Sequence, residues 1–410
     1  MNSSYKEIPR GLNKSLRPYQ KALTKSQYAH FSTFVVGLII HDKKTIQEIN
    51  DVLSKKDQSS LNRSIKSWNG ERLNEVRLAC VQRKFPTRED GLIIFDDTLA
   101  HKTGRHMEMA GYHRSGVTKS KEWSHCIVNS YYTHPNMQFG YPITADIFTN
   151  KTNEHYAYRP VKRLALDQLC YARLHGVKGV VCADSLYYAD YILRELDDNH
   201  EQYLIGTPET LKISINRAPR VSLKEYAGQV TYSRFRAKNQ WYRMHSFLAS
   251  IRNVGVRRII ISYREKDPDD KKFYVTNLNC SDKKLLRLLV CRWRIEVWHR
   301  DAKQHLGLED YQVRKDRSVR NVVLAVLVAY TVLMLSRLHA TLRRVAERVG
   351  RQWQTVGELC RFMRLATIKG WRWITRMLRE ELEAFKGILN REVVVKNAKV
   401  RRRNPYIIRL

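Results

Sequence analysis

The chain has 410 residues, which is enough for about two to four structural units. Lys and Arg together number 74 against 40 Asp and Glu, so the formal net charge is +34. A positive surplus of this size indicates a polyanionic partner, most often nucleic acid. The seven cysteines are scattered and form no CxxC pair, which argues against a structural zinc site or a secreted disulfide framework.

The hydropathy pattern of the sequence does not indicate a membrane protein. Residues Met1 to Arg10 are polar and contain no apolar signal core. The most apolar stretch, Val322 to Leu335, is shorter than the roughly 20 residues needed to span a bilayer, so it predicts a buried helix. No G-x-x-x-x-G-K-[ST] loop is present, so we expect no nucleotide cofactor. These features favour a reduced, cytoplasmic protein.

Residues 1–88 show the three- and four-residue apolar spacing of helices. Thr45 and Glu48 have the spacing of a capping box that opens one helix, and a break follows at residues 54–57. The next helix would point Asn62, Arg63 and Lys66 outward. A helix-turn-helix DNA reader has this pattern, but so does an ordinary helical hairpin, and the pattern alone favours the hairpin.

Residues 89–206 alternate strand-like and helical segments. The apolar run Leu92 to Phe95 ends in Asp96-Asp97-Thr98, and the run Val177 to Cys182 ends in Ala183-Asp184-Ser185. This alternation predicts an α/β domain with a mixed sheet. Its other expected segments are strands at His125–Tyr132, Tyr141–Phe148 and Tyr203–Gly206, and helices at Val161–His175 and Tyr187–Leu196.

Residues 207–280 break this alternation and predict a small β-rich insertion. The β-prone segments are separated by Gly, Asn, Asp and Pro, and they are Gln229–Arg236, Gln240–Phe247, Val256–Tyr263 and Lys272–Leu278. A long helical stretch begins at Ser281-Asp282, so residues 281–340 would complete the α/β core. Residues 341–410 would form a helical, basic C-terminal region.

Acids at the ends of two strands suggest a metal site. Asp97 and Asp184 would meet at the carboxyl edge of the sheet, where Mg²⁺ could relieve their repulsion. Glu296 is the candidate third acid. Arg292 lies four residues before it and Lys303 seven after, which places all three on one helical face. The alternative is an i,i+4 ion pair on a solvated face.

The order of these motifs resembles the DDE transposases of bacterial insertion sequences. The resemblance is to members with a ribonuclease H-like core, a β insertion before the third acid and a Y-x2-R-x3-E-x6-K signature, which Arg292, Glu296 and Lys303 match. It covers about residues 90 to 310. The chain departs from the signature at Leu289, which stands in place of the Tyr that contacts a phosphate in that family.

The resemblance implies a transposase that binds terminal inverted repeats, cleaves DNA and joins the 3′-OH end to target DNA. Asp97, Asp184 and Glu296 would then hold two Mg²⁺ ions, which Mn²⁺ could replace, and Arg292 and Lys303 would contact phosphates. In that family the first acid directly precedes Thr, which selects Asp97 over Asp96. A homodimer on double-stranded DNA and a location at the nucleoid are also implied. A nuclease that does not join DNA and an inactive DNA-binding relative are the alternatives.

Further residues are candidates for DNA contact. Lys102 and Arg105 lie on an expected hairpin loop after the first acids. Trp241 could stack on an unpaired base, although cross-strand packing is favoured for it. Trp293 and Trp298 flank Glu296 and are expected to anchor the core. The basic tail contributes Arg401, Arg402 and Arg403.

Overall fold

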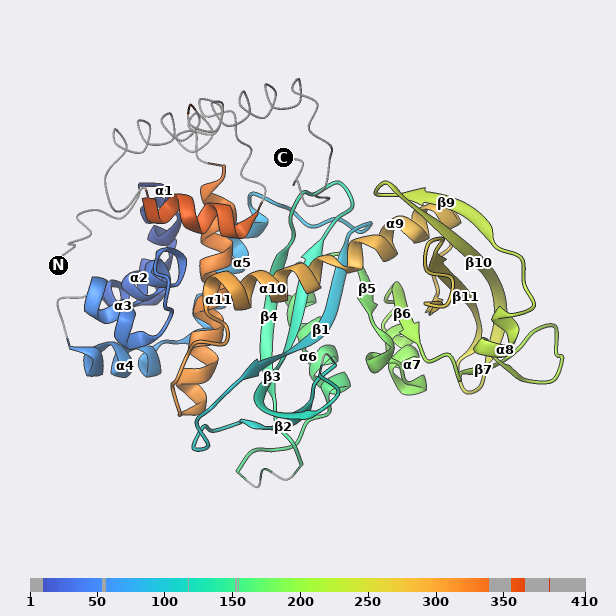
Figure 1. The fold of residues 1–410 in the computed structure, drawn as a ribbon, viewed down its shortest axis with the longest axis horizontal. Helices are drawn as coiled ribbons and strands as arrows, with labels where there is room; N and C mark the ends of the chain where they lie inside the picture. Colours follow the sequence, from blue (N-terminus) through green and yellow to red (C-terminus); the bar gives the residue numbers. More distant parts are fainter. Residues whose placement is uncertain are drawn as a thin grey trace, which may run out of the picture.

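The computed structural model describes residues 10–53, 57–116, 118–151, 153, 155–338, 355–365 and 383. The basic tail with Arg401, Arg402 and Arg403, and most of the expected region 341–410, therefore lie outside the described residues. A helical assembly, a central sheet and a β-rich lobe follow one another along the long axis of the molecule (Figure 1).

Short helices make up the N-terminal part, and their junctions follow local sequence signals. The side chain of Thr45 accepts a hydrogen bond from the backbone of Glu48 at 3.3 Å, while Glu48 itself pairs with Lys43. The capping box is thus half formed. Asp57 caps the next helix through Ser60 N. The elements are α1 Arg10–Leu16, η1 Arg17–Ala22, α2 Lys25–Ile40, α3 Ile46–Leu53, α4 Gln58–Ser67 and α5 Gly70–Gln82.

The expected mixed sheet is confirmed. Five of its strands run in the order β4–β3–β1–β5–β6, with β1, β5 and β6 mutually parallel and the β1–β3 and β3–β4 pairs antiparallel. The elements are β1 Leu92–His101, β2 Gly111–Arg114, β3 Lys121–Thr133, β4 Tyr141–Phe148, α6 Val161–Leu174, β5 Val180–Ala183, η2 Ser185–Tyr187, α7 Asp190–Asp198 and β6 Tyr203–Thr207.

The β-rich segment does not form a separate small sheet. Strand β12 pairs antiparallel with β6, so the insertion extends the core sheet to 12 strands. A short helix, α8, was not expected from sequence, although Ser222 and Glu225 form a complete capping box at its start. The elements are β7 Lys212–Ser214, β8 Val221–Ser222, α8 Leu223–Ala227, β9 Ser233–Ala237, β10 Gln240–Ile251, β11 Gly255–Arg264 and β12 Lys272–Thr276.

Three long helices follow the β-rich segment: α9 Asp282–Arg292, α10 Arg294–Leu306 and α11 Asp316–Ser336. Helix α11 has 21 residues and is the one described helix that is long and apolar enough to cross a membrane. However, 89% of its most apolar window is buried inside the protein. It packs against α2, α5 and β4, which confirms the expected buried helix.

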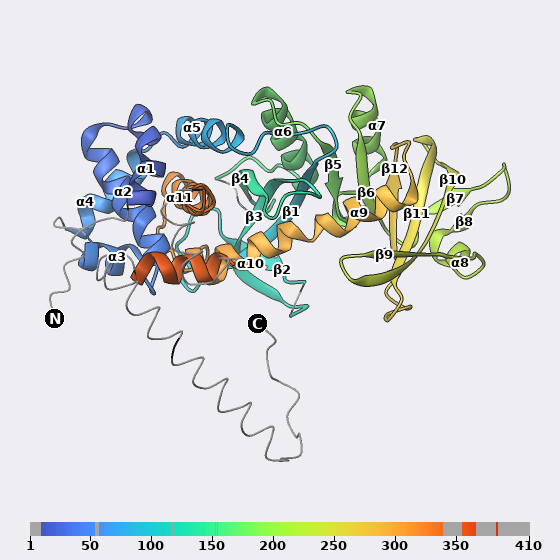
Figure 2. The ribbon, with the colours of Figure 1, turned by 90° about the horizontal axis from the view of Figure 1, so that it is seen from above.

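The two faces of the sheet carry different helices. Figure 2 shows α6 and α7 on one face and α9 and α10 on the other. One hydrophobic cluster joins Leu92 and Ile94 of β1 to α9, α10, α11 and the N-terminal helices. A second cluster joins Ile93 and Phe95 to α6 and α7. Because the first cluster extends into α2 and α4, these helices share one core with the sheet.

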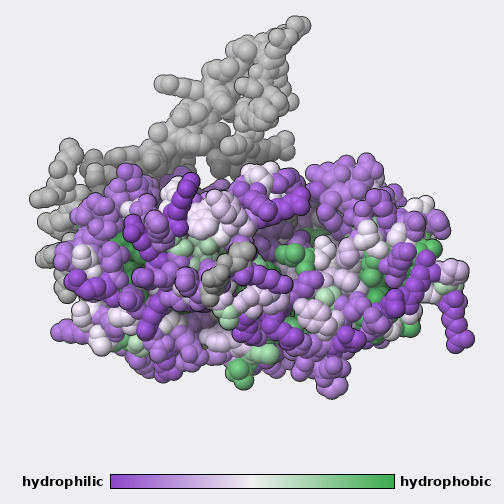
Figure 3. Space-filling view, turned by 90° about the horizontal axis from the view of Figure 1, so that it is seen from below, coloured by the Kyte–Doolittle hydropathy of each residue, from purple (hydrophilic) through white to green (hydrophobic). Residues whose placement is uncertain are grey.

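Hydrophilic side chains cover most of the described surface when the molecule is seen from below, and apolar residues appear there only as small, separated patches (Figure 3). Such a surface fits the strongly basic composition of the chain.

Candidate active site at the break between two helices

The two adjacent acids of β1 lie inside the strand and not at its tip. β1 continues to His101, whereas its parallel neighbour β5 ends at Ala183, opposite Phe95. Asp96 and Asp97 are therefore the first β1 residues beyond the end of β5, level with Asp184. The expected strand end is confirmed for Asp184 and wrong for Asp97, because pairing with β3 carries β1 onward.

The alternation of β1 separates Asp96 from Asp97. Ile94 packs on the α9–α10 face and Phe95 on the α6–α7 face, so Asp96 belongs to the former face and Asp97 to the latter. Contacts agree with this assignment. Asp96 Oδ2 lies 3.8 Å from His299 Nδ1 of α10, whereas Asp97 Oδ2 lies 3.7 Å from Cys126 Sγ of β3. By this criterion Asp96, and not Asp97, shares the sheet face of α10, while the charge of Asp184 acts on both carboxylates.

Asp184 is fixed by the turn that follows β5. Its side chain accepts a hydrogen bond from Leu186 N at 2.9 Å, so it caps the short helix η2 as well as facing the acids of β1. Gly206 of β6 makes room for this turn. A Cβ atom on Gly206 would lie 2.7 Å from Ser185 N and 2.8 Å from the carbonyl carbon of Asp184. A side chain at this position would displace Asp184.

Glu296 lies in the first turn of α10, just after a break in the helix. The single helical face expected for Arg292, Glu296 and Lys303 is interrupted at Trp293, which separates α9 from α10. Arg292 nevertheless reaches across the break, with its Nη2 3.4 Å from Glu296 Oε1. Lys303 Nζ pairs instead with Glu309 Oε1 at 3.1 Å.

Arg294 anchors the start of α10 to the sheet. Its guanidinium donates to Thr133 Oγ1 at 2.6 Å and to His134 O at 2.7 Å, both at the end of β3. No sequence motif indicated this contact, because its acceptors lie about 160 positions earlier in the chain. Of the two tryptophans expected in the core, Trp298 is buried, but Trp293 at the break is 59% exposed.

The carboxylates repel one another in a poorly hydrated site. Burial raises the pKa of Asp96 well above its usual value, the charges of Asp97 and Asp184 add to this shift, and Arg292 opposes it. Burial and the charge of Asp184 raise the pKa of Asp97 to about 6. Burial also raises the pKa of Glu296, Arg292 lowers it, and Asp184 raises it again.

This donor set fits a hard divalent cation in its chemistry, since carboxylate oxygens are the ligands that Mg²⁺ prefers. Positive charge between Asp96, Asp184 and Glu296 would remove the repulsion that raises the pKa of Asp96 and Glu296. As they stand, however, the described side chains include no group of three His, Cys, Asp or Glu placed to hold one ion. The pairing of Glu296 with Arg292 would have to open first.

The remaining predicted DNA contacts are divided. The α4 side chains Asn62, Arg63 and Lys66 are exposed, and so is Arg105. Trp241 is 41% exposed on the β9–β10 hairpin, where the Arg234 guanidinium lies 4.0 Å from its ring centroid.

Lys102 is a clear correction. It is only 8% exposed, because its ammonium group donates to Glu309 O at 2.8 Å and lies 3.4 Å from the ring centroid of Tyr311. Its structural partners lie about 200 residues away, so the sequence could not reveal them. Lys102 holds the chain after α10 and does not face solvent.

His299 is a residue of the site that the sequence reasoning did not select. It is 7% exposed and faces Asp96 one helical turn after Glu296. The i,i+3 spacing from Glu296 was the available signal, because residues three apart share a helical face. Burial lowers the pKa of His299 to about 3, so the ring is neutral beside the acids.

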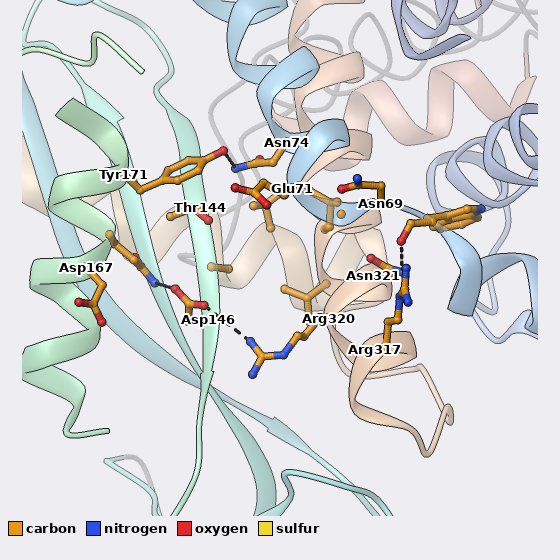
Figure 4. A pocket seen from close by; sticks show the side chains of 17 residues that line it. Asn69, Glu71, Asn74, Thr144, Asp146, Asp167, Tyr171, Arg317, Arg320 and Asn321 are labelled. Carbon is orange, nitrogen blue, oxygen red and sulfur yellow. Dashed lines mark hydrogen bonds and ion pairs between the residues drawn. The ribbon is translucent and has the colours of Figure 1, made fainter. Parts of the chain in front are cut away.

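A cavity of about 600 Å³ lies elsewhere, between α5, β4, α6 and the first turns of α11 (Figure 4). It is lined by Asp146, Asp167, Arg320 and Asn321, among others, and contains none of the three clustered acids. The carboxylate site is therefore separate from this cavity.

Comparison with known proteins follows this geometry. A family model described as a transposase DDE domain matches residues 88–332, which is more than half of the chain. The match includes both acids of β1, Asp184 and the whole of α9 and α10. A search of curated proteins found no match.

Proposed function

Because the chain belongs to the family of transposases with a DDE domain, we propose that it cleaves transposon ends and transfers their 3′-OH groups to target DNA. The family assigns a DNA-processing function of the transposase type. The observation that carries the finer proposal is the meeting of Asp96, Asp184 and Glu296 at the end of β5 and the start of α10. The ribonuclease H-like arrangement of the core sheet supports the same reading.

We assign the first carboxylate to Asp96 and not to Asp97. Asp96 shares a sheet face with α10, and the charges of Asp184, Arg292 and Glu296 all act on it. Asp97 lies on the opposite face, next to the buried Tyr187. Burial raises the pKa of Tyr187, and the charge of Asp97 raises it further. In this proposal Asp97 has a structural role, on the face of β1 that lies away from α10. The order of the three acids along the chain stays as expected from sequence.

Asp96, Asp184 and Glu296 would hold two Mg²⁺ ions, with Mn²⁺ as a substitute. When bound, such ions activate water or a 3′-OH and stabilise the leaving oxygen of a phosphodiester. Arg292 pairs with Glu296 and so limits the repulsion among the acids, and this pair would have to open for Glu296 to serve as a ligand. Lys303 can contact a phosphate only when it leaves Glu309. Leu289 is buried, so it packs in the core and does not replace the phosphate contact of the family's Tyr.

The DNA surfaces of this proposal lie on either side of the acids. Helix α4 would read the terminal repeat through Asn62, Arg63 and Lys66, which point away from the core. Arg105 and Trp241 would contact the DNA backbone or an unpaired base. We further propose that a homodimer brings two ends together and that the protein acts in the cytoplasm, at the nucleoid.

The test uses a labelled duplex selected from random DNA for binding, a target plasmid, and Mg²⁺ or EDTA. We expect cleavage and joined product with Mg²⁺ and neither with EDTA. Cleavage without joining would show that the protein is a nuclease and not a transposase. No cleavage at any metal concentration would reject catalysis.

The matched variants are Asp96→Asn and Asp97→Asn, because both remove one half-buried carboxylate from the same strand. Loss of a contact beyond the metal ligands typically costs about 10–100-fold in metal affinity or activity, so loss of a ligand should cost more than about 100-fold. We expect that loss for Asp96→Asn, Asp184→Asn and Glu296→Gln, with DNA binding retained. Asp97→Asn should keep measurable cleavage. The reverse ranking of the two β1 variants would reassign the first acid to Asp97.

A further inference from the structure

We propose that Asn321 is a positioning residue that locks the DNA-reading helix α4 at a fixed distance from the catalytic acids. The inference rests on the proposed function, because it takes α4 as the reader and the acids near β5 as the cleavage site. Its consequence is that the protein cleaves only at one fixed spacing from the sequence that it binds.

The first observation is the contact that ends α4. The side-chain amide of Asn321, on α11, donates to Ile65 O at 2.7 Å and to Trp68 O at 3.2 Å. Figure 4 labels Asn321 at the edge of the cavity. The last carbonyl groups of a helix lack partners within the helix. Ile65 O also accepts a hydrogen bond from Trp68 N at 3.4 Å, and Asn321 adds a shorter one from more than 250 positions away. Asn321 is only 3% exposed.

The link between α4 and α5 also rests on this residue. A Cβ atom on Gly70 would lie 2.8 Å from Asn321 Oδ1, so the chain passes the amide at a distance that glycine permits. Trp68, directly before this link, is 1% exposed and packs edge-on against Phe31 with ring centroids 5.2 Å apart. The end of α4 therefore has no free hinge toward α5.

The same helix α11 is fixed to the catalytic sheet. Arg320, next to Asn321, lies 3.7 Å from Asp146 of β4. Three turns further along, Thr331 accepts a hydrogen bond from Arg77, which also donates to Pro142 O of β4 at 2.7 Å. Leu61 and Ile65 of α4 and Ile94 of β1 belong to one hydrophobic cluster together with α11.

These contacts place α4, α11 and β1 in one hydrophobic core. Because close-packed interiors have low compressibility, we expect the distance between α4 and β1 to stay fixed. Inserting one base pair moves a scissile phosphate by about 3.4 Å along the duplex and rotates it by roughly 35°. A misplacement of about 1 Å can already cost on the order of 100-fold in rate. A reader on a flexible linker would follow the displaced bond, whereas a rigid one would not.

The first experiment uses the full-length protein and compares the unmodified selected duplex with duplexes that carry one, two or ten base pairs inserted between the bound sequence and the cleaved bond. We expect unchanged binding, within about twofold, and loss of cleavage by more than about tenfold at every insertion. Cleavage that moves to a new bond at the old rate would overturn the proposal. If the unmodified duplex is bound but not cleaved, the proposed function fails instead.

The second experiment removes the donor with Asn321→Asp, which keeps the size of the side chain. The control is Asn199→Asp, an exposed residue whose amide donates to Glu195 O at the end of α7, far from α4. At equal folded fraction, judged by thermal unfolding, Asn321→Asp should bind DNA but spread its cuts over neighbouring bonds. Cuts as sharply placed as those of the control would overturn the role of Asn321. If Asn321→Asp does not fold, the insertion series on the natural protein decides alone.

Discussion

Replacing Arg77 by Met should strongly destabilise the protein, because this side chain is a fully buried cation. Arg77 is 0% exposed, and burial lowers its pKa to about 10. Its guanidinium donates to Asn74 Oδ1 at 2.7 Å and 2.9 Å, to Pro142 O at 2.7 Å, to Thr331 Oγ1 at 3.2 Å and to Ile143 O. The acceptors come from α5, β4 and α11, so one residue joins the helical part to the sheet.

The expected loss in the free energy of unfolding follows from these contacts. Met restores most of the apolar stem but leaves buried acceptors without donors, each at a cost of about 1–3 kcal/mol. Ile143 O keeps a second donor, Asn74 Nδ2 at 3.2 Å, and removing the guanidinium also removes its desolvation penalty. The net loss should therefore be about 3–5 kcal/mol, a large part of the roughly 5–15 kcal/mol that a domain possesses.

Urea unfolding measures this loss as a shift of the midpoint at constant slope. Arg63→Met is the matched control, because Arg63 is exposed on α4 and its replacement should change stability by less than about 0.5 kcal/mol. Arg77→Lys should fall between the two, since Lys keeps the charge but lacks the forked donors. A loss below about 1 kcal/mol for Arg77→Met would refute the network as a stabilising element.

Two further predictions concern pH and a close backbone approach. A hydrogen bond from Lys315 and one from the backbone of Asp316 lower the pKa of Glu108 to about 2, so its contribution to stability is present above its usual pKa and is lost as the pH falls toward 2. The urea midpoint of Glu108→Gln should therefore fall less between pH 5 and pH 2 than that of the natural protein, and parallel curves would contradict this. Gly206→Ala should reduce DNA cleavage by displacing Asp184, whereas Gly116→Ala, where a Cβ atom meets nothing within 4 Å, should leave cleavage unchanged. Equal cleavage by the two Ala variants, measured at equal folded fraction, would show that the turn tolerates the displacement.

Much of the fold could be predicted because its signals are local. The apolar run before Asp96, the strand before Asp184 and the Ser281 cap of α9 all lie within a few residues of the elements that they define. Side-chain alternation along a strand also requires Asp96 and Asp97 to point to opposite faces. What it could not give is which face carries α10, because that depends on how helices nearly 200 residues later pack on the sheet.

The errors share this origin. Lys102 looked like a loop cation, but it is buried by carbonyl groups beyond α10. The helix breaks at Trp293 although no Pro or Gly stands there. The next residue, Arg294, forms the hydrogen bond to the end of β3. The pairing of β12 with β6 joins segments about 70 residues apart. Each depends on tertiary contacts that a single sequence does not record.

The backbone around the candidate acids is therefore positioned by strand pairing, by a close backbone contact and by hydrogen bonds of neighbouring residues. Asp96 is fixed by β1, which is paired on both sides up to Phe95 and with β3 beyond it. Asp184 is fixed by the turn that Gly206 admits, and the start of α10 by Arg294. Acids that repel one another can persist close together only when the surrounding structure imposes their positions. Because the backbone is already placed, completing the proposed metal site would require only that the Glu296 side chain turn from Arg292 toward the other acids.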